Sequence, residues 1–164
     1  MSTIQYMKEA LALARGYSDK LFQQFENSEE WLHQPHPNAN HALWCAGHIA
    51  RTDNMAIGFL APEKAHDPEG YKELFGRGSQ PSADAARYPN PATVVEYLND
   101  RRSTLMQLLE GLDDRDLEKP TPPGAPDFLP TIGAVLRTLV WHEGLHAGQV
   151  SIAHRCLGKP PLLA

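Results

Sequence analysis

Four long segments of the chain repeat hydrophobic residues every three or four positions, and prolines and glycines separate these segments. Such spacing gathers the apolar side chains on one face of an α-helix. A helix with one apolar face is stable only when that face packs against another element. The segments cover about residues 4–25, 38–61, 93–112 and 131–157, so the sequence predicts an all-α fold, a four-helix bundle.

The connections between these segments are long. Residues 61–91 contain eight prolines and glycines and no alternating strand pattern, so we expect a surface excursion with one short helix near residues 69–75. Loops of this length often serve as lids or pocket walls. The links do not force the helices to alternate up and down, so we expect long crossover connections within a single domain, residues 1–164.

Three of the long helices carry recognisable start signals. Thr131 is the expected N-cap of the last helix, and Gly158 is its expected stop. The residues Thr93–Glu96 match a capping box, in which the Thr hydroxyl and the Glu carboxylate each bind a free amide. For the second helix, Asn38 or Asn40 is the expected N-cap.

Charged residues of the first helical segment fall between its apolar positions. We expect them on the solvent side of the helix, opposite the apolar stripe. These residues are Lys8, Glu9, Arg15, Asp19 and Lys20.

Composition excludes several classes of function. The 15 basic and 20 acidic side chains give a net charge of −5, without a basic block, which weighs against nucleic-acid binding. No apolar run approaches the roughly 18 residues of a membrane span. The first residues lack the pattern of a signal peptide, so we expect a cytoplasmic protein with no membrane partner. The two cysteines, Cys45 and Cys156, exclude a disulfide framework.

Eight histidines are present, and two of them lie four residues apart in the last helical segment. His142 and His146 therefore lie one above the other on one helix face, with Cβ atoms about 5–6 Å apart. Leu139 and Val150 share that face, which predicts that it points into the bundle. Two buried imidazoles need partners. A metal ion is one such partner, and backbone carbonyls or water are the alternative.

The residues His142–His146 also match the H-E-x-x-H signature of zinc proteases. That site needs a third ligand further along the chain. The extended signature would place it at position 152, which is Ile152, and His154 is two residues out of place. No edge strand is expected to align a peptide, so the sequence disfavours a protease.

A third histidine ligand is available in the second helical segment. At helical spacing, the inward neighbours of His48 are His41, Trp44, Cys45, Thr52 and Met55. Glycine within a helix is unfavourable by about 1 kcal/mol relative to alanine, so Gly47 indicates a close approach or open space. Gly144 and Gly148 lie beside the other two histidines. Together the glycines predict a cavity between two closely packed helices.

These motifs resemble the DinB/YfiT-like superfamily of metal-binding four-helix bundles, over nearly the whole chain. The resemblance lies in five stretches: Asn40–Asp53 with its Gly47–Ala50 core, Tyr88–Pro89, Leu112–Leu117, His142–Gln149 and Leu157–Pro161. It implies a three-histidine site for a divalent metal, formed by His48, His142 and His146. It also implies a homodimer. The sequence departs from the family pattern in residues 61–91.

An open three-histidine site implies chemistry, because closed structural zinc sites usually have four protein ligands. A bound cation lowers the pKa of water or a thiol. The site could therefore hydrolyse a small molecule, or present a low-molecular-weight thiol to an electrophile. The resemblance favours thiol transfer. We expect zinc or nickel as the metal, with iron or manganese as alternatives. The alternatives are a non-catalytic metal-binding or stress-response module, and a bundle with ordinary core histidines.

Several neighbours of these histidines have two interpretations each. Glu143 is either a general base or one half of an ion pair between helices. Gln149 either binds a ligand or forms an interhelical hydrogen bond, and Cys45 is either a ligand or a buried structural thiol. His41 either lines the pocket or caps its helix. We expect Trp44 and Trp141 to be core residues beside the metal, and the remaining histidines to face solvent or loops: His33, His36, His66 and His154.

Overall fold

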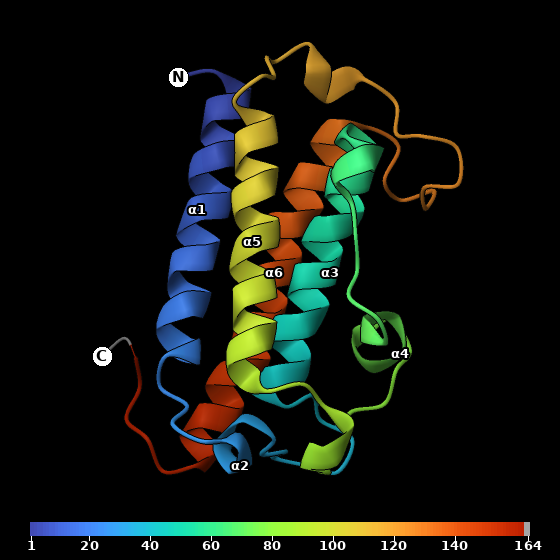
Figure 1. The fold of residues 1–164 in the computed structure, drawn as a ribbon. Coiled ribbons are helices and arrows are strands. Elements are labelled where there is room, and N and C mark those ends of the chain that lie inside the picture. The colour runs from blue at the N-terminus through green and yellow to red at the C-terminus, as the bar shows by residue number, and fades with distance from the viewer. Residues whose placement is uncertain (163–164) are drawn as a thin grey trace.

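A computed structural model describes residues 1–162 of the chain (Figure 1). Its long elements are α1 (Thr3–Phe22), α3 (Ala42–Leu60), α5 (Pro91–Leu109) and α6 (Ile132–Cys156). The short elements are the helices α2 (Ser28–Trp31) and α4 (Tyr71–Phe75) and the 3₁₀ turns Pro62–Lys64, Ala85–Arg87 and Asp116–Glu118. Residues 1–162 contain no β-strand, only one isolated bridge between Pro120 and Thr131. The predicted all-α bundle is confirmed.

Helix directions follow from the colour gradient of Figure 1. The helices α1 and α6 run one way, and α3 and α5 run the other way. The helix α3 packs against both α5 and α6, and α1 packs against α6. Because α3 and α5 are parallel neighbours, the chain between them returns along the full length of the bundle. Residues 61–90 make this return outside the bundle, with α4 against α3, which confirms a long crossover connection.

The ends of α6 agree with the sequence signals. Thr131 is the N-cap, and its side-chain oxygen accepts a hydrogen bond from the Ala134 amide at 3.2 Å. At the other end Gly158 has φ +79°, a left-handed conformation that glycine adopts without strain.

The starts of α3 and α5 differ from the sequence signals. His41 caps α3, since its Nδ1 accepts from the Trp44 amide at 3.0 Å, so the assignment to Asn38 or Asn40 is wrong. In α5 the N-cap is Asn90, and the capping box at Thr93 is wrong. Pro91 follows that cap, and its fixed φ and missing N–H suit the first position of a helix. The helix therefore starts at Pro91, before the position that the predicted capping box indicated.

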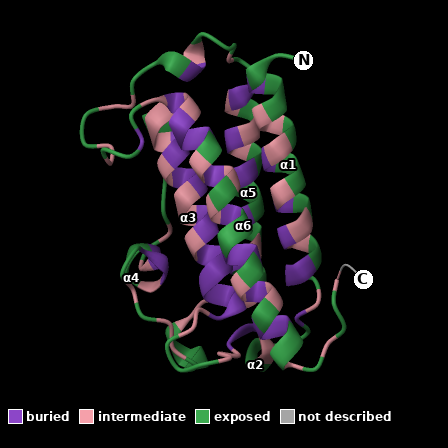
Figure 2. Cartoon of the chain, turned by 180° about the vertical axis from the view of Figure 1, so that it is seen from behind, coloured by how far each residue is buried: buried purple, intermediate pink, exposed green. Residues whose placement is uncertain are grey.

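The buried residues line the inner faces of the long helices (Figure 2), and the apolar ones among them form two clusters along the bundle. One cluster lies at the end where α2 and α4 pack, and includes Phe22, Leu43 and Leu98. The other lies at the opposite end and includes Leu11 and Leu136. Among the helices of residues 1–162, none is both long and apolar enough to cross a membrane.

The long helices carry five buried charged residues, Arg101 among them, and four of these, one on each long helix, form a group between the two clusters. They are Arg15 of α1, Asp53 of α3, Arg102 of α5 and Glu143 of α6. In each helix the charged residue falls between members of one cluster and members of the other. The outer-face position predicted for Arg15 is therefore wrong, because only 6% of this residue is exposed.

These four side chains form a closed network, which we call the charge layer. Arg15 donates to Glu143 at 2.6 Å and to Asp53 at 3.0 Å, and Arg102 donates to the same two carboxylates at 2.6 and 3.0 Å. The arginines also donate to the backbone carbonyls of Leu98 and Leu11. Two positive and two negative charges therefore balance inside the bundle, and each has several hydrogen bonds.

Removing one charge of this layer is expected to destabilise the fold strongly. The substitution Glu143→Gln keeps the side-chain shape but leaves two buried guanidinium groups with one carboxylate. Breaking a buried pair in this way costs about 3–5 kcal/mol, which denaturant unfolding would measure. The control Arg115→Ala removes an exposed ion pair with Asp113 and should leave the stability almost unchanged. Equal losses in the two variants would contradict a structural role for the layer.

Candidate metal centre

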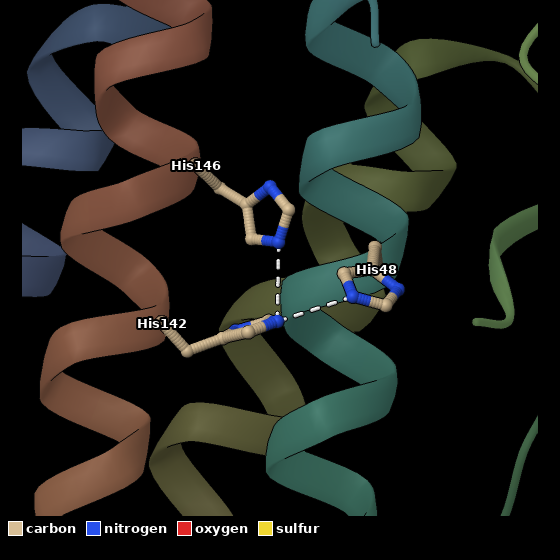
Figure 3. Close-up of side chains that lie close together, drawn as sticks. All are labelled: His48, His142 and His146. Atoms are coloured by element: carbon tan, nitrogen blue, oxygen red, sulfur yellow. Dashed lines mark hydrogen bonds between the residues drawn. The ribbon is translucent and has the colours of Figure 1, made fainter. Parts of the chain in front are cut away.

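Three histidines from two helices converge on one point between α3 and α6 (Figure 3). The Nε2 atom of His142 lies 3.1 Å from the Nε2 atom of His48 and 3.1 Å from that of His146. Ligand nitrogens of the three residues all lie within 4.8 Å of one another. Residues 94 positions apart in the sequence are therefore neighbours, as the sequence predicted.

The nitrogen spacing suits a divalent cation. Zn–N bonds of about 2.0–2.1 Å separate two ligand nitrogens by about 3.3–3.4 Å at a tetrahedral angle and by about 2.8–3.0 Å at a right angle. The observed 3.1 Å lies between these values. Two of the three nitrogen pairs therefore already have the spacing of ligands on one cation.

Outer hydrogen bonds leave two of these nitrogens free to bind a cation. The Nδ1 atom of His48 lies 2.7 Å from the carbonyl oxygen of Phe75, which can only accept, so this Nδ1 carries the hydrogen. In His146, Nδ1 donates to Gln149 Oε1 at 2.9 Å. A neutral imidazole with hydrogen on Nδ1 has its lone pair on Nε2, the atom that faces the cluster.

The three rings stay neutral over a wide range of pH. Burial lowers the pKa of His48 to about 4 and that of His142 to about 3, and it also lowers the pKa of His146. Neutral imidazole is the form that binds metal ions.

Convergence of these nitrogens is unfavourable without a cation. His142 Nε2 carries at most one hydrogen, while the Nε2 atoms of both neighbours present lone pairs. One hydrogen cannot form two good linear bonds, so at least one of the two close contacts is not a hydrogen bond. A cation at the common point would turn both contacts into attractive ones. The residues present therefore fit a divalent metal.

The charge layer explains why α6 turns these histidines toward α3. Glu143 must point to the bundle axis to reach Arg15 and Arg102. Neighbouring residues in a helix differ by about 100°, so His142 and His146 both lie to one side of Glu143, within about 40° of each other. That side faces α3, where His48 lies.

The expected role of Glu143 as a general base receives no support from this geometry. Both carboxylate oxygens accept short hydrogen bonds from the buried arginines, and the residue is 1% exposed. The structure therefore gives Glu143 the interhelical ion pair, which was the alternative interpretation.

The two tryptophans have different positions. The Trp44 ring stacks on His48, with centroids 4.5 Å apart and an interplanar angle of 15°, and its Nε1 donates to Ser79 Oγ at 2.8 Å. This places Trp44 beside the candidate site, as expected. Trp141 is 64% exposed, so its predicted place in the core is wrong.

Gln149 joins the cluster to the start of α3. Its Oε1 accepts from Asn40 Nδ2 at 3.0 Å as well as from His146, which is the interhelical alternative predicted for this residue. The Sγ atom of Cys45 also lies 3.6 Å from this oxygen. Cys45 is buried, and burial raises the pKa of its thiol, so it fits the structural interpretation.

The glycines of the two helices are not equivalent. A Cβ atom at Gly47 would lie 2.4 Å from the ring of Phe75, so this glycine permits a close approach. Gly144 and Gly148 are exposed, and a Cβ atom added at either position would meet no other part of the protein within 4 Å. The prediction that they border a cavity is therefore wrong.

The other histidines differ in burial. His41 is fully buried against Tyr88, so it is a helix cap and not a residue of an open pocket mouth. His154 is 2% exposed beside Phe25, so its predicted place at the surface is wrong. His36 and His66 are exposed as expected, and His33 is half-buried.

A separate pocket of about 480 Å³ opens between the end of α1 and the start of α5. Its walls include Phe22, Trp31 and Val95, and none of its lining residues belongs to the histidine cluster. The residues able to hold a metal therefore lie away from this pocket.

Comparison with known proteins places the chain in a family. The family model of the DinB superfamily matches residues 10–150, and the chain therefore belongs to this superfamily. A conserved protein from Enterococcus faecalis, known from its crystal structure, shares the fold with a TM-score of 0.68. The two are 18% identical, and the similarity covers 97% of this chain and 99% of that one. No curated protein matches the chain.

Buried histidine makes stability depend on pH. Burial lowers the pKa of His41 from 6.5 to about 4, so below pH 6.5 the unfolded chain binds more protons than the folded chain. The contribution of neutral, buried His41 to the free energy of unfolding is therefore complete above about pH 6.5, and it is lost as the pH falls toward about 4. We expect the urea midpoint to fall between about pH 7 and pH 5. The variant His41→Asn keeps a capping oxygen but does not titrate, so its urea midpoint should fall less over the same pH range. An equal fall of the midpoint in the two proteins would contradict the contribution of His41.

Proposed function

We propose that this DinB superfamily protein binds a divalent metal through His48, His142 and His146 and uses it to transfer a low-molecular-weight thiol to a small electrophile. The observation that carries the proposal is the convergence of three Nε2 atoms, with contacts of 3.1 Å and with the Nδ1 hydrogens of His48 and His146 bound elsewhere. The site takes three neutral ligands, which leaves further coordination positions for a substrate.

Zinc or nickel is the proposed metal, with iron or manganese as alternatives. Imidazole ligands suit all four metals, and the order of affinity among divalent ions favours nickel and zinc over manganese and iron. A divalent metal held by neutral ligands keeps its full charge and lowers the pKa of a water or thiol bound beside it.

The residues around the site favour a thiol over water as the nucleophile. The carboxylate nearest in sequence, that of Glu143, is held by two arginines and is not available to take a proton from water. A thiol is the more acidic of the two and needs no general base beside such a metal. Cys45 stays a protonated, buried thiol, so the reacting sulfur comes from a separate molecule. In the transfer, sulfur bonds to the electrophilic carbon, the leaving group departs, and the thiol proton goes to solvent.

Metal content tests the site directly. Protein purified without a histidine tag and loaded with Zn²⁺ or Ni²⁺ should retain about one ion per chain after dialysis, because three ligands hold it. Each of His48→Ala, His142→Ala and His146→Ala should retain only a small fraction of that amount in elemental analysis.

The matched control for these variants is His66→Ala, because His66 is exposed and lies outside the cluster. It should bind as much metal as the unsubstituted protein. Unchanged metal content in His48→Ala would show that the three residues do not form the site.

Thiol-transfer assays test the reaction. The metal-loaded protein, given small thiols and alkyl or aryl electrophiles, should consume both in equal amounts, and a chelator should abolish this consumption. Hydrolysis of small esters or amides without any thiol would indicate a hydrolase instead. No turnover by metal-loaded protein would indicate a binding module.

A further inference from the structure

The ring of Phe75 occupies a notch in α3 that exists because residue 47 is glycine. A Cβ atom at Gly47 would lie between 2.4 and 2.7 Å from three atoms of the ring, so no other residue fits there without moving Phe75. Phe75 is fully buried at the end of α4 and packs against Tyr71 with ring centroids 5.1 Å apart. This contact fixes the end of α4, within the excursion, against the helix that carries His48.

With its ring packed against Gly47, Phe75 has its backbone carbonyl beside His48. The carbonyl oxygen of Phe75 lies 2.7 Å from His48 Nδ1. A carbonyl can only accept, so the hydrogen of the neutral imidazole must be on Nδ1, and the lone pair is left on Nε2. The contact selects the tautomer of the candidate ligand.

A second contact from the same stretch fixes the plane of the ring. Ser79 Oγ donates to the carbonyl oxygen of Leu74 at 3.0 Å and accepts from Trp44 Nε1 at 2.8 Å. Trp44 in turn stacks on the His48 ring. Residues 71–79 therefore contact His48 directly through the Phe75 carbonyl. They also act on it indirectly, through the hydrogen bond of Ser79 to the Trp44 indole.

We propose that residues 71–79 are a positioning element for His48, and that Gly47 is the residue that admits it. The element holds the imidazole with Nε2 toward His142 and His146, so it preorganises the cluster before a metal arrives. This inference rests on the proposed metal site for its effect on binding, but the tautomer of His48 tests it without any metal.

Metal affinity is the first measurement. Gly47→Ala should displace Phe75 and release His48 Nδ1. Loss of an outer hydrogen bond to a metal-binding histidine typically weakens metal binding about 10- to 100-fold. The dissociation constant for Zn²⁺, measured by competition with a chromophoric chelator, should rise by that factor.

A matched control has the same substitution on the other helix. Gly144 is also inside a long helix, but it is exposed and an added Cβ would meet nothing within 4 Å. Gly144→Ala should therefore leave the zinc dissociation constant within about twofold of the original value. Equal affinities in Gly47→Ala and the unsubstituted protein would overturn the proposal.

The tautomer is the second measurement, made on metal-free protein. Long-range ¹H–¹⁵N spectra of protein labelled at histidine distinguish hydrogen on Nδ1 from hydrogen on Nε2. His48 should carry it on Nδ1, and Gly47→Ala should move the population toward Nε2–H, the form that free histidine prefers. A purely structural role of Phe75 would not change this signal. Hydrogen on His48 Nε2 in the unsubstituted protein would overturn the proposal.

A milder variant covers the case in which Gly47→Ala fails to fold. Ser79→Ala removes the two hydrogen bonds to Leu74 and Trp44 without placing an atom in the core, and should weaken zinc binding about 2- to 10-fold. Unchanged affinity in this variant would count against the indole contact. If the unsubstituted protein bound no metal, the proposed function would fail, while the tautomer measurement would still decide this inference.

Discussion

Four buried charges at mid-height hold the bundle together. Because each long helix contributes one of them, the pairing of Arg15 and Arg102 with Asp53 and Glu143 fixes how far each helix is shifted along its neighbours and how it is rotated. Apolar contacts above and below the layer tolerate many registers, but a buried charge out of register would lose its partner. The layer therefore specifies one arrangement of helices out of many that would bury similar apolar area.

The candidate site depends on the same layer. Glu143 lies next to His142 in the chain, and its inward direction turns the two histidines of α6 toward α3. Asp53 belongs to the helix of His48 and fixes that helix against the same two arginines. The two halves of the cluster, His48 on α3 and the pair on α6, are thus brought to one level by residues that do not belong to it. The charges that hold the fold also align the ligands.

Periodicity and spacing predict most of the fold and the pair His142 and His146, because both depend on local regularity: a helical stripe, and two imidazoles four residues apart. His48 joins this pair as a ligand through the resemblance to the DinB superfamily. The same patterns miss the charge layer at Arg15, which they assign to the outer face. Arg15 follows Leu11 by four residues and precedes Ser18 by three, so it lies on the buried stripe. A charged residue at such a position indicates a buried pair, but its partners lie on other helices and cannot be read from spacing. Trp141 is misplaced because an aromatic side chain on an outer face looks like a core residue in the sequence.

Phe75 acts on His48 through its main chain, and this has a consequence for comparing relatives. A carbonyl group is the same for every residue type, so two proteins can share this contact while their residues at the contact differ. In the sequence, such a contact is marked only by the glycine on α3, Gly47. This glycine lies far along the chain from Phe75, whose ring it makes room for. Residue-by-residue alignment would then record a small residue at position 47 and give no sign of the atom that it brings to the histidine.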